Sequence, residues 1–195
     1  MKRPGLILAS ASPRRRELLA WAGVEFEVWP AQVEETVLPG ETPQDNVRRL
    51  ALAKAKEAAA RFPHSWVLSA DTIVVLDGRI MGKPGNETRA ADMLRRLSGR
   101  VHLVMTGFCL LAPQSGPQVV DHVETEVEFR ELSDRDIARY IASGEVWDKA
   151  GAYAVQGQGA GLVSRIKGSY TNVIGLPLAE VLGRLKDFGL LPSTV

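Results

Sequence analysis

Short apolar runs of strand length alternate along this chain with helical segments rich in Ala and Leu, and the alternation follows no strict period. The β-prone run Trp66–Leu76 is followed at once by Asp77-Gly78, a dipeptide typical of a tight hairpin. A second β-rich stretch covers Val101–Phe129. A doubly wound fold needs regular strand–helix–strand units, and hairpins interrupt them. The pattern therefore predicts a mixed α/β fold, with a mixed sheet and flanking helices.

Capping residues mark the expected helices. Ser12-Pro13 opens one that runs to about Ala22 and stops at Gly23, and Thr42-Pro43 opens a longer one that ends near Arg61. The other expected elements are strands at Leu6–Ala9 and Val24–Val28, and helices capped by Asn86, Ser133 and Pro177. Glycine-rich loops are expected over residues 150 to 176.

Composition excludes several classes of protein. The chain has 195 residues, of which 45% are hydrophobic and 24% charged, as in an ordinary globular domain. Lys and Arg number 24 against 23 Asp and Glu, so net charge does not indicate a nucleic-acid partner. Cys109 is the only cysteine, which fits a reducing compartment. The apolar run Leu6–Ala9 is too short for a signal sequence, and no run is long enough to span a bilayer, so we expect no membrane contact and a cytoplasmic location.

The first candidate site lies at the junction of a strand and a helix, where Ser10-Ala11-Ser12-Pro13-Arg14-Arg15 stands. Backbone N–H groups at a helix N-terminus favour anions. Hydroxyls of Ser10 and Ser12 and the guanidinium groups of Arg14 and Arg15 would complete a phosphate cradle. The alternative is a capped helix with solvated arginines.

Acidic and basic residues supply the next candidates. Asp71 interrupts an apolar run, and a carboxylate is costly to bury unless it is paired, metal-bound or catalytic. Its alternative is a half-exposed strand end. Glu35, in an acidic loop with Glu34, could supply a hard oxygen ligand for magnesium or manganese, or could simply be solvated. Lys54, in an Ala-rich helix, and Lys83, after the hairpin, could each be an ordinary surface lysine.

A polar patch with several glycines follows later in the chain. Gln156 stands among apolar residues and glycines, and its amide both donates and accepts hydrogen bonds. These properties suit recognition of a nucleobase edge, whereas the alternative is a glutamine that only satisfies backbone groups in the loop.

Taken together, these motifs resemble the Maf proteins, a family of nucleoside triphosphate pyrophosphatases. The resemblance rests on motifs in the expected order over nearly the whole chain: Ser10-Ala11-Ser12-Pro13-Arg14-Arg15, Ala70-Asp71-Thr72, Lys83-Pro84, Asp148-Lys149-Ala150-Gly151, Gln156-Gly157, Gly168-Ser169-Tyr170 and Val173-Ile174-Gly175-Leu176-Pro177. Lys149-Ala150-Gly151-x-Tyr153 followed by Gln156 is similar to the branch that acts on dTTP and UTP. The branch that prefers 7-methyl-GTP is the nearest competitor.

The resemblance implies a fold and an activity. The expected fold has two lobes around a central cleft, like inosine triphosphate pyrophosphatase, in a single domain over residues 1–195. The expected reaction cleaves dTTP or UTP, or modified pyrimidine nucleotides, into the monophosphate and pyrophosphate with a divalent cation, Mg or Mn. A homodimer is left open.

The resemblance also implies roles for individual residues. Asp71 carries over as the proton acceptor that activates water. The chemistry of a carboxylate also allows Asp71 to hold the metal together with Glu35, and the sequence alone does not separate these two roles. The residues carried over as substrate-binding are Ser10, Arg14, Arg15, Lys54, Thr72, Lys83 and Gln156, with Arg14, Thr72 and Gln156 at positions linked to substrate selection.

Two hypotheses from other classes stand beside this one. The first is a nucleotide-binding regulator of cell division, acting in septum inhibition without turnover, which would not need a carboxylate opposite a basic cradle. The second is an RNA-binding domain that uses Arg14 to Arg16, which would need more positive charge and more stacking aromatic residues than the 6% present.

Overall fold

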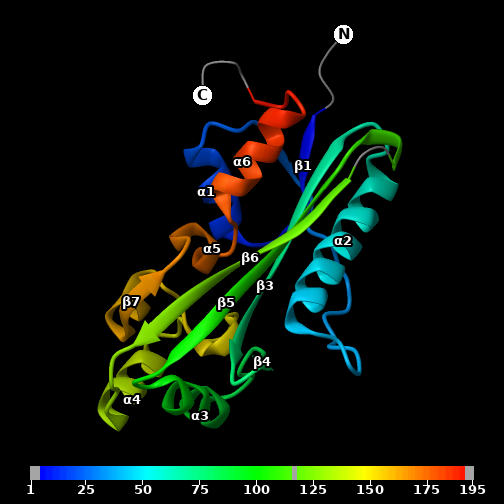
Figure 1. The fold of residues 1–195 in the computed structure, drawn as a ribbon. Coiled ribbons are helices and arrows are strands. Elements are labelled where there is room, and N and C mark those ends of the chain that lie inside the picture. The colour runs from blue at the N-terminus through cyan, green and yellow to red at the C-terminus, as the bar shows by residue number, and fades with distance from the viewer. Residues whose placement is uncertain (1–4, 116–117, 192–195) are drawn as a thin grey trace. The chain divides into compact units, whose positions relative to one another are not determined.

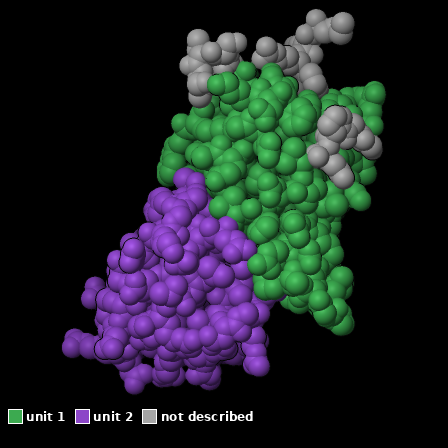
Figure 2. Space-filling model, viewed as in Figure 1, with its two compact units in different colours: residues 1–71, 106–123, 175–195 green, residues 72–105, 124–174 purple. Residues whose placement is uncertain are grey.

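The structure is a computed structural model that describes residues 5–115 and 118–191. Its contacts divide the chain into two compact units, coloured separately in Figure 2. Unit 1 combines residues 1–71, 106–123 and 175–195, and unit 2 combines residues 72–105 and 124–174. Each unit is therefore assembled from stretches that lie far apart in the sequence.

Strands and helices alternate without a strict period, as predicted. The strands are β1 (Leu6–Leu8), β2 (Glu27–Val28), β3 (Trp66–Leu76), β4 (Arg79–Met81), β5 (Val101–Leu111), β6 (Gln118–Phe129) and β7 (Val163–Lys167). The α-helices are α1 (Pro13–Trp21), α2 (Pro43–Arg61), α3 (Glu87–Leu97), α4 (Asp134–Ala142), α5 (Tyr170–Ile174) and α6 (Leu178–Asp187). Short 3₁₀ turns are η1 (Pro113–Ser115), η2 (Ala150–Ala152) and η3 (Gly157–Leu162).

Among the described residues, the strands form a seven-stranded sheet in the order β2-β1-β3-β5-β6-β7, with β4 paired to β3 beside this path. β1 is parallel to both β2 and β3, whereas β4 is antiparallel to β3 and β7 is antiparallel to β6. The hairpin between β3 and β4 turns at Asp77 and Gly78, both with positive φ (52° and 72°). The mixed sheet with flanking helices and the predicted hairpin are thus confirmed.

In unit 1, helix α2 approaches the sheet closely because its inward face is made of small residues. Ala51, Ala55 and Ala58 are fully buried and pack against β1 and β3. Gly107 of β5 lies so near the helix that a Cβ there would stand 2.4 Å from the backbone of Val47. Figure 1 shows α2 on one side of the unit 1 strands and α1 and α6 on the other.

In unit 2, α3 and α4 pack together over a core that includes residues of β3, β5 and β6. An aromatic cluster lies in this core, formed by His102, Phe129 and Tyr153. His102 is 2% exposed, and Nδ1 of its ring has no hydrogen-bond partner among the described residues. Burial lowers the pKa of His102 to about 4, so its imidazole is neutral at physiological pH.

The structure corrects three local expectations. The strand predicted over Val24–Val28 is only the two-residue β2, and both residues are exposed. The glycine-rich region contains β7 and α5 in addition to loops. Ser12 occupies the N-cap position of α1, but its side chain makes no capping hydrogen bond.

No helix in the described part of the chain is both long enough and apolar enough to cross a membrane.

Replacing Gly107 with Ala should destabilise the protein by about 3 kcal/mol, because the added methyl group overlaps the α2 backbone and neither element can move freely. The matched control is Gly183→Ala inside α6, where nothing lies within 4 Å of the added Cβ. That change should stabilise by about 0.5–1 kcal/mol, since Ala is the better helix former. Denaturant unfolding measures both, and equal stabilities for the two variants would contradict the close packing.

His102 should make stability depend on pH. The unfolded chain binds a proton at this histidine near pH 6.5, whereas the folded chain does so only near pH 4. The free energy of unfolding should therefore fall as pH is lowered from 6.5 to 4, by up to ~3 kcal/mol from this group. Unfolding curves measured at several pH values give the free energy of unfolding as a function of pH. This free energy should change less with pH in His102→Gln than in the parent, whereas in the exposed His64→Gln it should change as in the parent. The same slope in all three proteins would contradict this assignment.

Candidate active site

Lys54 lies on the buried face of α2. It belongs to a series at intervals of three or four residues that faces the sheet and includes Val47, Ala51, Lys54 and Ala58. Lys54 is only 8% exposed, and Nζ donates a hydrogen bond of 2.6 Å to Oδ1 of Asp71. It is therefore not the ordinary surface lysine of the alternative interpretation.

Asp71 lies within β3 rather than at its end. Side chains alternate along a strand, so Val67, Ser69 and Asp71 share the face that α2 covers. Ser69 Oγ donates to the carbonyl of Ala51 in α2, which confirms the direction of this face. Asp71 is 6% exposed, and the interpretation as a half-exposed strand end is wrong. A buried carboxylate requires a partner, and Lys54 provides it.

Glu35 is the second carboxylate at Lys54. Its Oε1 accepts a hydrogen bond of 2.6 Å from Nζ, although 44% of the Glu35 side chain is exposed. One ammonium group thus lies against two carboxylates that come from a strand and a loop. Because Glu35 is partly solvated, removing its side chain should cost less stability than removing one partner of the buried pair of Lys54 and Asp71.

The loop that carries Glu35 is fastened to α2 at both ends. Near its start, the backbone N–H of Gln32 donates to Glu57 over 2.7 Å. Near its end, Arg49 donates to Glu41 over 2.6 Å and to the carbonyl of Thr36 over 2.8 Å. The bond from Arg49 lowers the pKa of Glu41 to about 2. Sequence reasoning missed these anchors, because no spacing distinguishes them from other charged residues.

Arg15 connects three parts of unit 1. Its Nε donates to the carbonyl of Gly175 over 2.7 Å, and its Nη1 donates to the carbonyl of Ala70 over 2.7 Å and to Ser10 Oγ over 3.2 Å. Burial lowers the pKa of Arg15, while the charge of Asp71 acts in the opposite direction. Arg15 therefore holds the junction of β1 and α1 against the residue that precedes Asp71.

The phosphate cradle expected at the start of α1 is partly organised. Ser10 is 6% exposed, and its Oγ accepts from the backbone N–H of Ser12 over 3.2 Å as well as from Arg15. Arg14 is half-buried and Arg16 is exposed. The role of Ser10, Arg14 and Arg15 in binding phosphate stays a prediction.

Unit 2 contains the other predicted residues. Thr72 follows Asp71 in β3, Lys83 is exposed after β4, and Gln156 is half-buried at the start of η3, where its side chain makes no capping bond. The backbone N–H of Gly151 donates to the carbonyl of Gly82 over 3.1 Å, so the segments around Lys83 and Gly151 adjoin each other. A shared site for these residues and Asp71 stays a prediction.

The donor set at Lys54 fits a divalent cation bound together with phosphate. No group of three or more His, Cys, Asp or Glu side chains that could hold a metal occurs in residues 5–115 and 118–191. Magnesium, however, is usually held by only one or two carboxylates together with substrate phosphates. Glu35 and Asp71, which converge on one ammonium group, supply such a pair.

The fold and this site are those of a mixed α/β protein with a buried lysine–carboxylate centre. A family model described as Maf-like protein matches residues 5–188, and the chain belongs to this family. The resemblance found in the motifs is thereby confirmed.

Curated relatives agree with this assignment, and a solved structure shares the fold. A protein of Syntrophus aciditrophicus named dTTP/UTP pyrophosphatase is 54% identical over 186 residues, covering 95% of this chain and 91% of its own. A protein of the same name from a Geobacter species is 51% identical over 191 residues, covering 98% and 99%. The Ham1 protein of Staphylococcus aureus has a similar fold, with a TM-score of 0.50 at 17% identity over 92% of this chain and 99% of its own.

Replacing Lys54 with Met should destabilise the protein by about 3 kcal/mol, because it leaves the Asp71 carboxylate buried without its partner. Lys56→Met, on the exposed side of the same helix, is the matched control and should change stability by less than about 0.5 kcal/mol. Denaturant unfolding at neutral pH measures the difference. Equal stabilities for the two variants would show that Lys54 does not support Asp71.

Proposed function

We propose that this chain is a nucleoside triphosphate pyrophosphatase that cleaves dTTP and UTP between the α and β phosphates. Modified pyrimidine nucleoside triphosphates are further proposed substrates. The observation that carries the proposal is the buried Asp71 carboxylate held by Lys54 within β3. Relatives at about half identity with the name dTTP/UTP pyrophosphatase support it. The products are the nucleoside monophosphate and pyrophosphate.

Asp71 acts in this proposal as the general base. Its carboxylate accepts a proton from the attacking water, whose oxygen bonds to phosphorus as the bond to the pyrophosphate oxygen breaks. Lys54 engages Oδ1, so Oδ2 is the atom assigned to the water. The fixed ion pair keeps the carboxylate in one orientation, and orientation of the nucleophile is a large part of catalysis.

The second requirement of the reaction is that positive groups neutralise the negative charge of the phosphates. Arg14 and Lys83 are the cations assigned to the triphosphate, and Ser10 is assigned as a hydrogen-bond donor. Glu35 and Asp71 would hold the divalent cation, Mg or Mn. When bound, this cation neutralises charge that develops on the phosphate oxygens.

Base selection is assigned to Gln156. Its amide offers an acceptor and donors that match the O4 and N3–H edge shared by uracil and thymine. Cytosine carries a donor at position 4, so an amide held in one orientation leaves buried groups unpaired against it. Thr72, next to Asp71, is assigned to substrate selection as well.

The relatives' names favour this proposal over a regulator of cell division without turnover. A binding protein also has no physical need to bury a carboxylate–lysine pair, because desolvation of both charges costs free energy. The proposal places the enzyme in the cytoplasm.

The test is pyrophosphate release from dTTP, UTP, CTP and GTP with Mg or Mn. The parent should prefer dTTP and UTP, and Asp71→Asn should reduce kcat by about 10²-fold or more, the loss expected for a general base. The fold should remain intact in the variant, as judged by circular dichroism.

Asp77→Asn provides the control, since this carboxylate lies in the exposed hairpin turn. It should retain parental kcat. Near-normal turnover by Asp71→Asn at saturating metal would remove Asp71 as the base, and absence of pyrophosphate release from the parent with any of the four nucleotides would overturn the proposed activity.

A further inference from the structure

The segment that leads to Gln156 has an unusual backbone. Gly151 and Ala152 follow each other with φ of 67° and 61°. Glycine adopts this left-handed conformation readily, whereas Ala152 adopts it against the clash of its Cβ with the backbone. Ala152 is fully buried, and such strain persists only where neighbouring contacts impose it. The contacts around this segment therefore have to be strong.

Tyr153 is the first of these contacts. Its Oη lies 2.7 Å from Nε2 of His102, in the interior of unit 2. The rings of His102 and Phe129 pack edge-on against Tyr153, with centroid distances of 5.3 and 4.7 Å. This cluster fixes the backbone directly after Ala152, three residues before Gln156.

Tyr140 of α4 holds the next residue. Its Oη accepts a hydrogen bond of 3.0 Å from the backbone N–H of Ala154, two residues before Gln156. Gly159 packs closely against the same hydroxyl. A Cβ at this position would stand 2.8 Å from Tyr140 Oη and 2.1 Å from the carbonyl oxygen of Ala154. The chain on either side of Gln156 is thus packed around one phenol.

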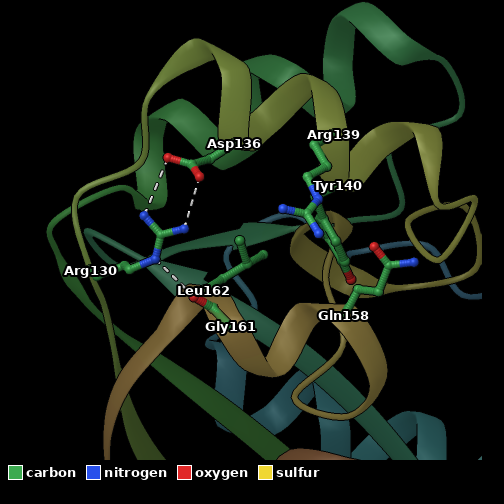
Figure 3. Close-up of a pocket in the computed structure, with 7 residues that line it drawn as sticks. All are labelled: Arg130, Asp136, Arg139, Tyr140, Gln158, Gly161 and Leu162. Carbon is green, nitrogen blue, oxygen red and sulfur yellow. Dashed lines mark hydrogen bonds and ion pairs between the residues drawn. The ribbon is translucent and has the colours of Figure 1, made fainter.

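Charged groups hold the chain beyond Gln156. Glu145 accepts hydrogen bonds from the backbone N–H groups of Gln158 and Gly159 over 3.1 and 3.3 Å. Figure 3 shows Arg130 between Asp136 of α4 and the carbonyl of Gly161, at 3.0 and 2.8 Å. The pocket in this view, lined also by Arg139, Tyr140, Gln158 and Leu162, lies beside the loop.

We propose that the hydroxyls of Tyr153 and Tyr140 are positioning groups that set the orientation of Gln156 and thereby the preference for uracil-type bases. The inference rests on the proposed function and adds residues that do not touch the base. The bonds of the two tyrosine hydroxyls hold the backbone between the strained Ala152 and Gln156, and relaxation of that backbone would turn the amide of Gln156. A site that hydrogen-bonds the edge of a base discriminates only while its donors and acceptors point at that edge.

The test compares Tyr153→Phe and Tyr140→Phe, each of which removes one oxygen atom and keeps the ring. Tyr170→Phe is the matched control, because the chain has three tyrosines and Tyr170 is 48% exposed. Steady-state pyrophosphate release gives kcat and KM for dTTP, UTP, CTP and GTP. The ratio of kcat/KM for UTP to that for CTP should fall about tenfold in both variants, because cytosine presents the reversed pattern of donor and acceptor to the Gln156 amide. CTP turnover and the Tyr170→Phe ratios should stay parental.

A double-mutant cycle with Gln156→Ala separates positioning from general stability. In the Gln156→Ala background, Tyr153→Phe should cause no further loss of the UTP-to-CTP ratio. An equal loss of kcat/KM for all four nucleotides, or a ratio that stays parental in both phenylalanine variants, would overturn the inference and leave the proposed function standing. No turnover in the parent would overturn both.

Discussion

The ion pair between Lys54 and Asp71 is the interaction on which the arrangement of unit 1 depends. Both side chains are nearly buried, and Nζ lies 2.6 Å from Oδ1. Neither charge could remain in this interior alone, because the desolvation cost of an isolated ion exceeds what packing returns. The pair joins α2 to β3, and the same ammonium group reaches the Glu35 loop. A single cation therefore connects three elements and brings two carboxylates into one small volume.

Small residues make this pair possible. Alanines on the inward face of α2 and the absence of a side chain at Gly107 let the helix lie close to the strands. A lysine on a more distant helix would reach solvent before it reached Asp71. Arg15 fixes the neighbouring backbone through the carbonyl of Ala70, so the carboxylate is held from the strand side as well as from the helix side. Packing and electrostatics here support the same geometry.

In unit 2, side chains fix a loop that has little regular secondary structure. The segment from Gly151 to Gly161 contains two 3₁₀ turns and two consecutive left-handed residues, and it belongs to no strand. Its backbone therefore lacks the regular hydrogen bonds of paired strands. Side chains of Tyr140, Glu145 and Arg130 provide bonds to that backbone instead. Such a loop gains rigidity from its surroundings, which suits a segment that has to present one amide in one orientation.

Much of the fold and part of the site follow from the sequence by itself. Periodicity and capping residues predict α2, α3 and α4 and the β3–β4 hairpin, because these signals act within a few residues of each other. The ordered motifs identify the family and single out Asp71, and the resemblance to the family adds Lys54 and Glu35. The short β2 and the strand β7 were not predicted correctly, since their formation depends on partners distant in the chain.

Only the tertiary structure decided which side chains meet. It pairs and buries Asp71 and Lys54, and it directs Arg15 to backbone carbonyls. It also places the hydroxyls of Tyr140 and Tyr153 where they hold the loop of Gln156. The physical reason is that each of these contacts joins residues far enough apart in sequence that no local pattern records which side chains meet.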